Sequence, residues 1–532
     1  MVMTMDHRGV DLCNVHLLAQ DRPALLDLIK SCGEQRDLCK ARRLHSEILH
    51  RKLFPKEISI KNALLTMYVN CSAVREAQEV FDATHVRNVV TWSALISGLA
   101  RHGHVEEALS SFRKMQEEGI SPNEVTFVSA LKSCSSISCL KMGEEIHVHI
   151  IKHGLIQDNV VLGNALIDMY AKCGMIGKAQ EVFEELPVRN VVTWNVLITY
   201  YSHQDLANDV LICFDRMRDE GILPDVVTFI CILKACGTLG FLEIGEEIHA
   251  KVDMCGFLEK NVVLGTAIVD MYARCGMLEK ARQVLSEIPT RNTVAWSALI
   301  SGYALHGLGE EALACFEQMQ NECFVPDSIT FISILKACGI TGYLHMGEEV
   351  HAQAETLGLL VEKDIVLGTA LVDMYAKCGA LGKAQEVFNK LLTRNVVSWN
   401  ALMAGYTQVG GAEVAVGLFN QMMAEGIYPN AITCLALLNL CNHAGLVDEG
   451  QMIFNDMERS YYLTPTIEHY TCMVDLFSRA GEFEKAKHYL VDDVSTLLAF
   501  LGACHKLGKI DLGRLAFKKI MQLDEKCAAA YV

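Results

Sequence analysis

Residues 190–201 read NVVTWNVLITYY, and three near copies of this stretch occur elsewhere in the chain. The copies are NVVTWSALISGL from Asn88, NTVAWSALISGY from Asn292 and NVVSWNALMAGY from Asn395. Together the four stretches contain all four tryptophans, Trp92, Trp194, Trp296 and Trp399, at spacings of 102, 102 and 103 residues. A period sustained over most of 532 residues indicates a repeat array rather than a series of unrelated domains.

The composition narrows the classes of partner. Hydrophobic residues make up 51% of the chain, but no uninterrupted apolar run reaches the roughly 18 residues that a membrane span needs. We therefore expect a soluble chain with no membrane partner and no small-molecule substrate. The formal net charge of -17 gives no long-range attraction to a polyanion, so any nucleic-acid binding must depend on local contacts.

The 21 cysteines do not have the spacing of a zinc or disulfide framework, because no C-x-x-C pair occurs. Nine of them recur at two positions: Cys32, Cys134, Cys236, Cys338 and Cys441, and Cys71, Cys173, Cys275 and Cys378. Recurrence at one position predicts a small residue buried between helices, in a reducing compartment. The sequence predicts no metal and no cofactor.

The 102-residue block divides into units of 35, 36 and 31 residues, at 191–225, 226–261 and 262–292. The predicted array of 14 units covers 22–491: 22–57, 58–88, 89–123, 124–159, 160–190, 191–225, 226–261, 262–292, 293–327, 328–364, 365–395, 396–430, 431–466 and a shortened 467–491. Residues 1–21 form an N-terminal segment that we expect to be poorly ordered, and 492–532 form a C-terminal extension.

Each unit has the pattern of two helices. In 191–225, apolar residues recur at helical spacing from Trp194 to Tyr201 and again from Val210 to Met217, and Gly221 with Pro224 then provides a stop signal. Two short helices cannot bury their apolar faces alone, so the units must stack into an all-α solenoid. Tetratricopeptide repeats, at 34 residues, are the competing family.

The repeated residues resemble pentatricopeptide repeat (PPR) proteins. The shared features are the V-V-T-W-[NS]-x-L-I start, the E-A-L-x-x-F-x-x-M middle and the G-I-x-P-[DN] end of the units. The alternating lengths resemble the plant PLS subclass, in which P, L and S units correspond here to 35, 36 and 31 residues. The resemblance covers about 22–532 and implies a right-handed α-solenoid superhelix.

The resemblance implies binding of single-stranded RNA, with one base per unit and the amino terminus toward the RNA 5' end. In this family the fifth and last residues of a P or S unit read each base, which suits short polar side chains facing an unstacked base edge. The pairs are Asn62/Asn88, Ser93/Asn123, Asn164/Asn190, Asn195/Asp225, Thr266/Asn292, Ser297/Asp327, Thr369/Asn395 and Asn400/Asn430, and Thr471 is the fifth residue of the last unit.

A structural interpretation of the same residues stays open. Asn or Asp immediately before V-V-T is what a helix N-cap needs, and capping alone could explain the last residue of a unit. It explains the fifth residue less well, because Asn195 and Asn400 would lie within a helix, where Asn has poor propensity. The two roles can coexist.

The L units depart from the reading pattern, because their fifth residues are apolar: Leu26, Val128, Ile230, Ile332 and Leu435. We expect these units to be spacers. By the family's code, Asn with Asp favours U, Asn with Asn favours C or U, Ser or Thr with Asn favours A, and Ser or Thr with Asp favours G. The chain then reads 5'-Y-A-n-Y-U-n-A-G-n-A-Y-n-R-3', where the final purine depends on Thr471 alone.

Two further sets of residues recur beside these pairs. The second residues Val90, Val192, Val294 and Val397 resemble family residues that wedge between bases, although burial in the helix pair is the alternative. For the four tryptophans we predict packing on the neighbouring unit rather than stacking on RNA.

Catalysis by this chain is not expected. Related PLS proteins often carry a deaminase domain that binds zinc through H-x-E and C-x-x-C, whereas this chain has only the H-x-E triplets at His45 and His104. The tail LLAFLGACHKLGKIDLGRLAFKKIMQLDEKCAAAYV resembles the start of the extension that follows the repeats in editing factors, which implies a truncated E-like helical extension.

The sequence therefore predicts a site-recognition protein for organellar RNA that specifies a C-to-U editing site for a deaminase supplied by a partner. A factor for splicing, stability or translation of an organellar transcript is the first alternative, and a protein-binding helical scaffold is the second. A mitochondrial or plastid location follows from the resemblance only, because residues 1–20 are not rich in Arg and Ser.

Overall fold

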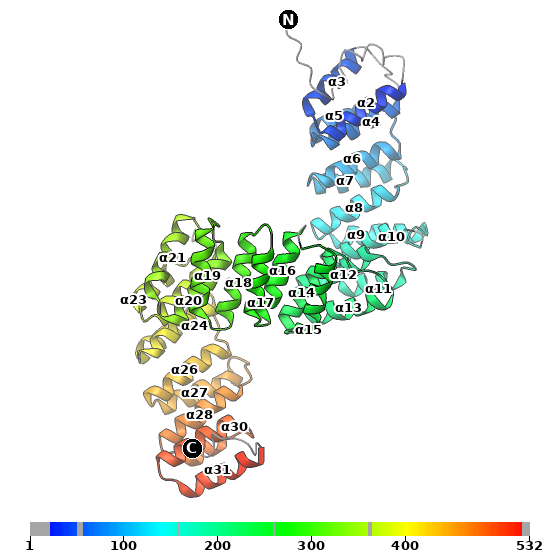
Figure 1. Cartoon of the computed structure of the whole chain (residues 1–532). Coiled ribbons are helices and arrows are strands. Elements are labelled where there is room, and N and C mark those ends of the chain that lie inside the picture. The colour runs from blue at the N-terminus through cyan, green and yellow to red at the C-terminus, as the bar shows by residue number, and fades with distance from the viewer. Residues whose placement is uncertain (1–21, 51–56, 158, 259–260, 360–363, 524–532) are drawn as a thin grey trace. The chain divides into compact units, whose positions relative to one another are not determined.

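The structure of the chain is a computed structural model that describes residues 22–50, 57–157, 159–258, 261–359 and 364–523. In these residues it contains 30 helices and no strand, so the predicted all-α fold is confirmed (Figure 1). The segment 1–21, predicted to be poorly ordered, lies outside the described residues. The chain divides into two compact units, 1–239 and 240–532, and each is described by itself.

The first compact unit is a succession of short helices. They are α2 (Arg22–Gln35), α3 (Leu38–His50), α4 (Ile58–Asn70), α5 (Val74–Asp82), α6 (Val89–Arg101), α7 (Val105–Glu117), α8 (Glu124–Ser136), α9 (Leu140–Lys152), α10 (Val160–Lys172), α11 (Ile176–Glu185), α12 (Val191–His203), α13 (Ala207–Asp219) and α14 (Val226–Leu239).

The second compact unit continues the alternation. Its helices are α15 (Leu242–Met254), α16 (Val262–Arg274), α17 (Leu278–Glu287), α18 (Thr293–Leu305), α19 (Gly309–Asn321), α20 (Ser328–Thr341), α21 (Leu344–Thr356), α22 (Ile365–Lys377), α23 (Leu381–Lys390), α24 (Val396–Gln408), α25 (Ala412–Ala424), α26 (Ala431–Ala444), α27 (Val447–Arg459), α28 (Ile467–Arg479), α29 (Phe483–His488), α30 (Val494–Lys506) and α31 (Ile510–Leu523).

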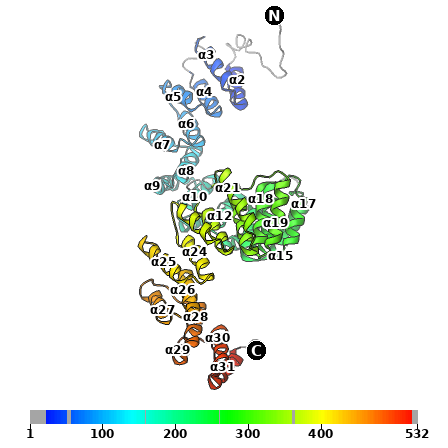
Figure 2. The ribbon, with the colours of Figure 1, turned by 90° about the vertical axis from the view of Figure 1, so that its left-hand side faces the viewer.

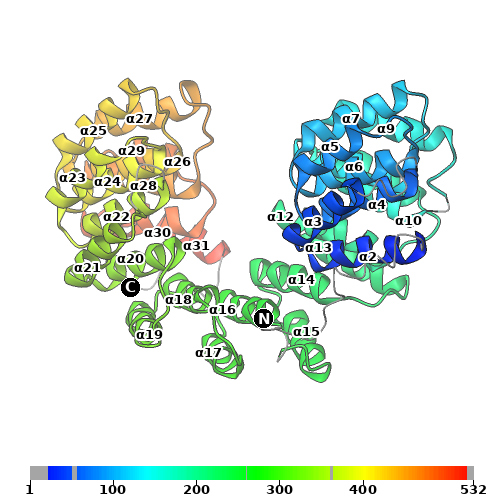
Figure 3. The same ribbon diagram turned by 90° about the horizontal axis from the view of Figure 1, so that it is seen from above.

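Even-numbered helices are the first helices of the repeats and odd-numbered helices are the second. Within each compact unit, every first helix packs against the next first helix, and a second helix packs between its own first helix and the following one. Seen along the stack, α19, α21, α23 and α25 lie on the outer rim and α18, α20, α22 and α24 lie inside them (Figure 3). Figure 2 shows the pairs α24/α25, α26/α27 and α28/α29 following one another. The first helices therefore form a continuous inner layer.

The local sequence determines where the helices begin and end. Helix α12 begins after Asn190, whose side chain accepts the Thr193 N–H at 3.0 Å, while the Thr193 hydroxyl oxygen accepts the Asn190 N–H at 3.2 Å. This reciprocal capping box satisfies two backbone donors that would otherwise lack partners. At the other end of the repeat, Gly221 has φ +72°, a left-handed conformation that terminates α13.

The tryptophans pack in the core, as predicted. Trp194 is fully buried and meets Phe183 edge to face, with ring centroids 4.7 Å apart. The Arg189 guanidinium lies 4.6 Å from the centre of the Phe183 ring and pairs with Glu220 at 2.7 Å, while the Trp194 indole N–H donates to Glu220 at 3.1 Å. Because these residues come from adjacent S and P units, they join the two units.

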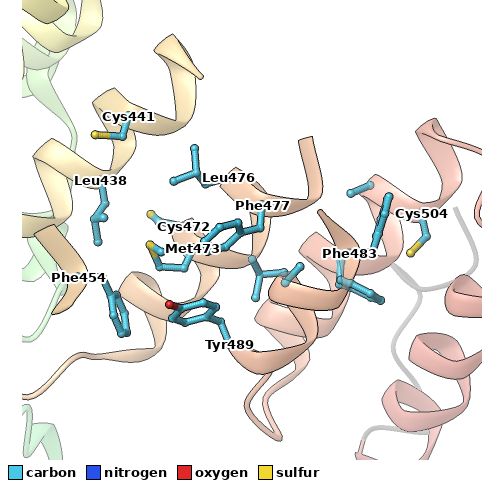
Figure 4. Close-up of a cluster of buried hydrophobic side chains, with 14 of the residues drawn as sticks. Leu438, Cys441, Phe454, Cys472, Met473, Leu476, Phe477, Phe483, Tyr489 and Cys504 are labelled. Carbon is cyan, nitrogen blue, oxygen red and sulfur yellow. The ribbon is translucent and has the colours of Figure 1, made fainter. Parts of the chain in front are cut away.

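Apolar packing continues beyond the last predicted unit. Figure 4 shows Phe477 of α28 beside Tyr489, with stacked rings 5.4 Å apart, and Phe454 of α27 meets Tyr489 edge to face at 5.2 Å. Helix α30 packs against α28 and adds Phe500, which meets Phe483 at 5.8 Å. The pair α30/α31 therefore stacks on the array in the manner of a further repeat.

Candidate nucleic-acid interface

An exposed aliphatic row marks one face of the first helices. Val192, the second residue of α12, is 51% exposed, and its equivalents at Val90, Val125, Val161, Val227, Val263, Val294, Ile329, Val366, Val397 and Ile432 are exposed too. The alternative that these valines are buried in the helix pair is therefore wrong. Positions two, five and nine of a helix share one face, and we call this face of the first helices the reading face.

Fifth and last residues come together at the junction between repeats. Asn195 of α12 donates an amide hydrogen to Asp225 Oδ1 at 2.8 Å, although 30 residues separate them. Thr228, the third residue of the next unit, donates its hydroxyl to Asn195 Oδ1 at 2.6 Å. Asn195 is only 8% exposed, so it presents a small and fixed polar edge.

The same contact recurs at four other junctions. The distances from the fifth residue to the last are 3.3 Å for Asn62/Asn88, 3.0 Å for Ser93/Asn123, 3.2 Å for Ser297/Asp327 and 3.1 Å for Asn400/Asn430. In each of them the hydroxyl of a threonine from the next unit also contacts the fifth residue: Thr91, Thr126, Thr330 and Thr433. The four P units thus share one arrangement, which a single S unit also has.

The other three S-unit pairs, Asn164/Asn190, Thr266/Asn292 and Thr369/Asn395, make no direct hydrogen bond within the described residues. Thr266 instead donates to the Val262 carbonyl at 2.9 Å. Asn164 Oδ1 and Thr369 Oγ1 are buried atoms with no hydrogen-bond partner in the described part of the chain. An unsatisfied buried polar atom is costly, so these two atoms would gain from a ligand that hydrogen-bonds to them.

The last residues also cap the following helices. The side chains of Asn88, Asn123, Asn190, Asp225, Asn292, Asp327, Asn395 and Asn430 each accept a backbone N–H from the first turn of the next first helix. The capping interpretation of these residues is therefore confirmed. Where the fifth residue also donates to it, one oxygen both begins a helix and holds the neighbouring polar side chain.

Hydrogen bonding keeps Asp225 in its charged form. Burial would raise the pKa of this carboxyl, but the Thr228 N–H, the Asn195 amide and the Thr228 hydroxyl outweigh it and lower the pKa below its ordinary value. The P unit at 191–225 therefore presents an anionic acceptor beside an amide, whereas Asn88, Asn123 and Asn430 present a neutral amide in the same place.

The structure places Asp493 in the position of a last residue for Thr471. Helix α29 has six residues, and the next first helix, α30, begins at Val494 with Asp493 as its N-cap, which accepts the Ser495 N–H at 2.7 Å. We did not predict Asp493, because the expected unit ended at 491. The signal was an acidic residue immediately before V-S-T, the same pattern as at the other junctions.

Within the described residues, nothing resembles a metal or thiolate centre. No group of three or more His, Cys, Asp and Glu side chains in that part of the chain could hold a metal ion. Cys32, Cys134, Cys236, Cys338 and Cys441 are buried as predicted, while Cys71, Cys173, Cys275 and Cys378 are only half-buried. Burial raises the pKa of Cys134 and of Cys338 to about 12, so both remain protonated thiols.

The two H-x-E histidines have structural contacts instead. His45 Nδ1 lies 2.8 Å from the Tyr68 hydroxyl across the junction of an L and an S unit, and His104 Nδ1 lies 3.0 Å from Glu107. The described helices also include none that is long and apolar enough to cross a bilayer.

Known repeat sequences match much of the chain. The profile of the PPR repeat family matches 87–136, 189–238, 291–339 and 394–443, and the profile of the PPR repeat matches 164–191, 266–292, 369–396, 432–462 and 468–492. A pentatricopeptide repeat-containing protein of Arabidopsis thaliana, named as mitochondrial, is 34% identical over 527 residues, which cover 98% of this chain and 76% of the relative. The chain belongs to the pentatricopeptide repeat family.

Other PPR proteins resemble it over most of its length. A pentatricopeptide repeat-containing protein of Arabidopsis thaliana named as chloroplastic is 33% identical over 503 residues, which cover 93% of this chain and 61% of the relative. The crystal structure of PPR10 from maize superposes with a TM-score of 0.54 at 16% identity, over 96% of this chain and 93% of PPR10. PPR10 in complex with an 18-nt psaJ RNA element superposes at 0.55 and 17% identity, over 94% and 81%. These likenesses support the solenoid fold of this PPR protein.

Proposed function

We propose that this PPR protein binds single-stranded RNA in an organelle and that each P or S unit reads one base. The observation that carries the proposal is the row of polar pairs at successive junctions, beside the exposed aliphatic row of the reading face. An unstacked base has an apolar face and a polar edge, so an aliphatic side chain next to a fixed donor and acceptor suits both. The printed title of the PPR10 complex, which names an RNA, is in line with this assignment.

The reading pairs predict the RNA sequence. The pair Thr471/Asp493 turns the final purine into G under the same code, so the string becomes 5'-Y-A-n-Y-U-n-A-G-n-A-Y-n-G-3'. Here each n faces an L unit, whose fifth residue is an apolar side chain that is half-buried in all five cases.

The process served is proposed to be C-to-U editing, with the deaminase supplied by a partner protein. Support comes from the 35, 36 and 31 alternation of the PLS subclass and from the helical pair α30/α31 after the repeats. Relatives named as mitochondrial or chloroplastic support an organellar location. Splicing, stability or translation of an organellar transcript would use the same RNA-binding face.

RNA binding is tested with the purified chain and two synthetic RNAs at a fixed salt concentration. One RNA carries the predicted string, and the other has purines and pyrimidines exchanged at the nine read positions. We expect clear preference for the first. Equal binding to both, or none to either, would contradict sequence-specific recognition and favour a protein-binding scaffold.

Editing is tested in plants that lack the protein, by sequencing organellar transcripts that contain the predicted string. The proposal expects one C near such a string to remain unedited. Normal editing together with an unspliced or shortened transcript would replace editing by RNA processing and leave RNA binding intact.

A further inference from the structure

The L units carry lysines at one repeated place on the reading face. Lys30, Lys132, Lys234 and Lys336 each occupy the ninth position of an L-unit first helix, in α2, α8, α14 and α20. The ninth residue lies one helical turn, about 6 Å along the axis, beyond the fifth residue on the same face. Each L unit therefore combines an apolar fifth residue with a cation one turn further along.

Most of these lysines have no ion partner. Lys30, Lys132 and Lys336 are exposed and pair with no acidic side chain in the described part of the chain. Lys234 differs, because it contacts Asp205 at 2.9 Å and the Ser202 carbonyl at 2.7 Å. An unpaired ammonium on a protein of net charge -17 is available to an anion.

The S-unit cations of the same face are already paired. Each lies four residues after an aspartate of its own helix: Asp168 with Lys172 at 3.0 Å, Asp270 with Arg274 at 2.9 Å, Asp373 with Lys377 at 2.7 Å and Asp475 with Arg479 at 2.9 Å. Such pairs reduce the local positive potential. The positive charge that remains for a polyanion therefore comes mainly from the L units.

A groove joins one of these lysines to a reading pair. Lys30 lines a groove of about 590 Å³ together with Asn62, Asn88 and the exposed Val90. Glu34 also lines it, one turn beyond Lys30. A nucleotide whose base meets Asn62 and Asn88 would thus have Lys30 within the same hollow of the surface.

We propose that Lys30, Lys132 and Lys336 bind phosphates of the RNA backbone, so that the L units supply affinity while the P and S units supply sequence preference. This inference rests on the proposed function. A base edge that meets position five leaves its phosphate farther along the first helix, which is where position nine lies. The nucleotides that face L units are then held without being read, because a phosphate contact carries no sequence information.

The proposal predicts a specific change in salt dependence. For single strands each phosphate contact contributes about 0.7 to the slope of log affinity against log salt. The triple variant Lys30→Gln, Lys132→Gln, Lys336→Gln should therefore lower the slope by about 2.1, and affinity at 0.1 M salt should fall about 100-fold. The ratio of affinities for the predicted and exchanged RNAs should not change.

The control removes the same charge from exposed lysines of second helices: Lys114→Gln, Lys141→Gln and Lys518→Gln. A gain-of-contact variant, Asn439→Lys, restores lysine to the ninth position of the L unit at 431–466 and should raise the slope by about 0.7. The control triple should change neither the slope nor the preference.

The outcomes separate the two claims. An unchanged slope in the first triple, or an equal change in both triples, overturns the lysine proposal even when the wild-type chain prefers the predicted RNA. A reduced slope in a chain that lacks sequence preference supports the phosphate contacts and contradicts base reading. No RNA binding by the wild-type chain overturns both.

Discussion

Replacing Asn195 by serine should change the base preferred at the fifth nucleotide of the predicted string from U to G. The Asn195 amide group has two hydrogens, and one is donated to Asp225; its oxygen has two acceptor sites, and one is occupied by Thr228. One donor and one acceptor remain, which suits uracil. A serine has only one hydrogen, and in the matching unit Ser297 directs its hydroxyl toward Asp327 and Thr330.

Asn195→Ser would therefore leave acceptors only, beside the Asp225 carboxylate. Guanine offers N–H donors to such a site, whereas uracil loses the donor that it used. Protein–DNA interfaces give a scale of about 1–3 kcal/mol for one mismatched position, or about 5- to 150-fold in affinity. Stability should change little, because the Ser297 junction shows that serine fits beside Asp and Thr.

The assay compares four RNAs that differ only at the fifth nucleotide, at one salt concentration, for the wild type and for Asn195→Ser. The reciprocal variant Ser297→Asn is the matched control and should change the preference at the eighth nucleotide from G to U. An equal loss for all four bases would mean that residue 195 only supports the fold. No change for any base would mean that it does not face the RNA.

Three further outcomes follow from the burial of particular side chains. Val192→Glu should weaken RNA binding in a filter or anisotropy assay yet leave thermal unfolding unchanged, because Val192 is exposed; unchanged RNA affinity would contradict the reading face. Trp194→Ala should cost about 3–5 kcal/mol, seen as faster hydrogen exchange in α12 and α13, because a fully buried ring is lost; unaltered exchange would contradict the packing. Burial lowers the pKa of His147, so the unfolded chain binds this proton at higher pH than the folded chain; stability should fall as pH drops below about 6.5, and His147→Gln should flatten that dependence in unfolding scans at pH 7.5 and 5.5.

The repeat period made much of the fold predictable. Tryptophans such as Trp194, recurring within a helical apolar pattern, indicated a core position, and Trp194 is fully buried. An asparagine before V-V-T indicated an N-cap, and Asn190 caps α12. Both signals are local, because a cap and an apolar stripe involve residues only a few positions apart.

The contacts of the site were less predictable, because they depend on packing between repeats. The bond between Asn195 and Asp225 joins residues in consecutive first-helix layers, and no periodicity reveals its length. Val192 and its neighbour Val191 are both apolar, so the sequence alone could not show which one faces outward. Asp493 was missed because α29 is short, which places the next cap two residues after the expected end of the unit.

The double use of the junction residue limits how the protein can change its target. Any side chain at Asp225 or Asn123 must begin a helix as well as face a base, and Asn and Asp are both strong helix starters. An exchange between these two amino acids would alter the base preference at almost no cost in folding, whereas most other replacements would damage the solenoid first. New specificities could therefore arise in single neutral steps, from an alphabet of two letters at this place in every repeat.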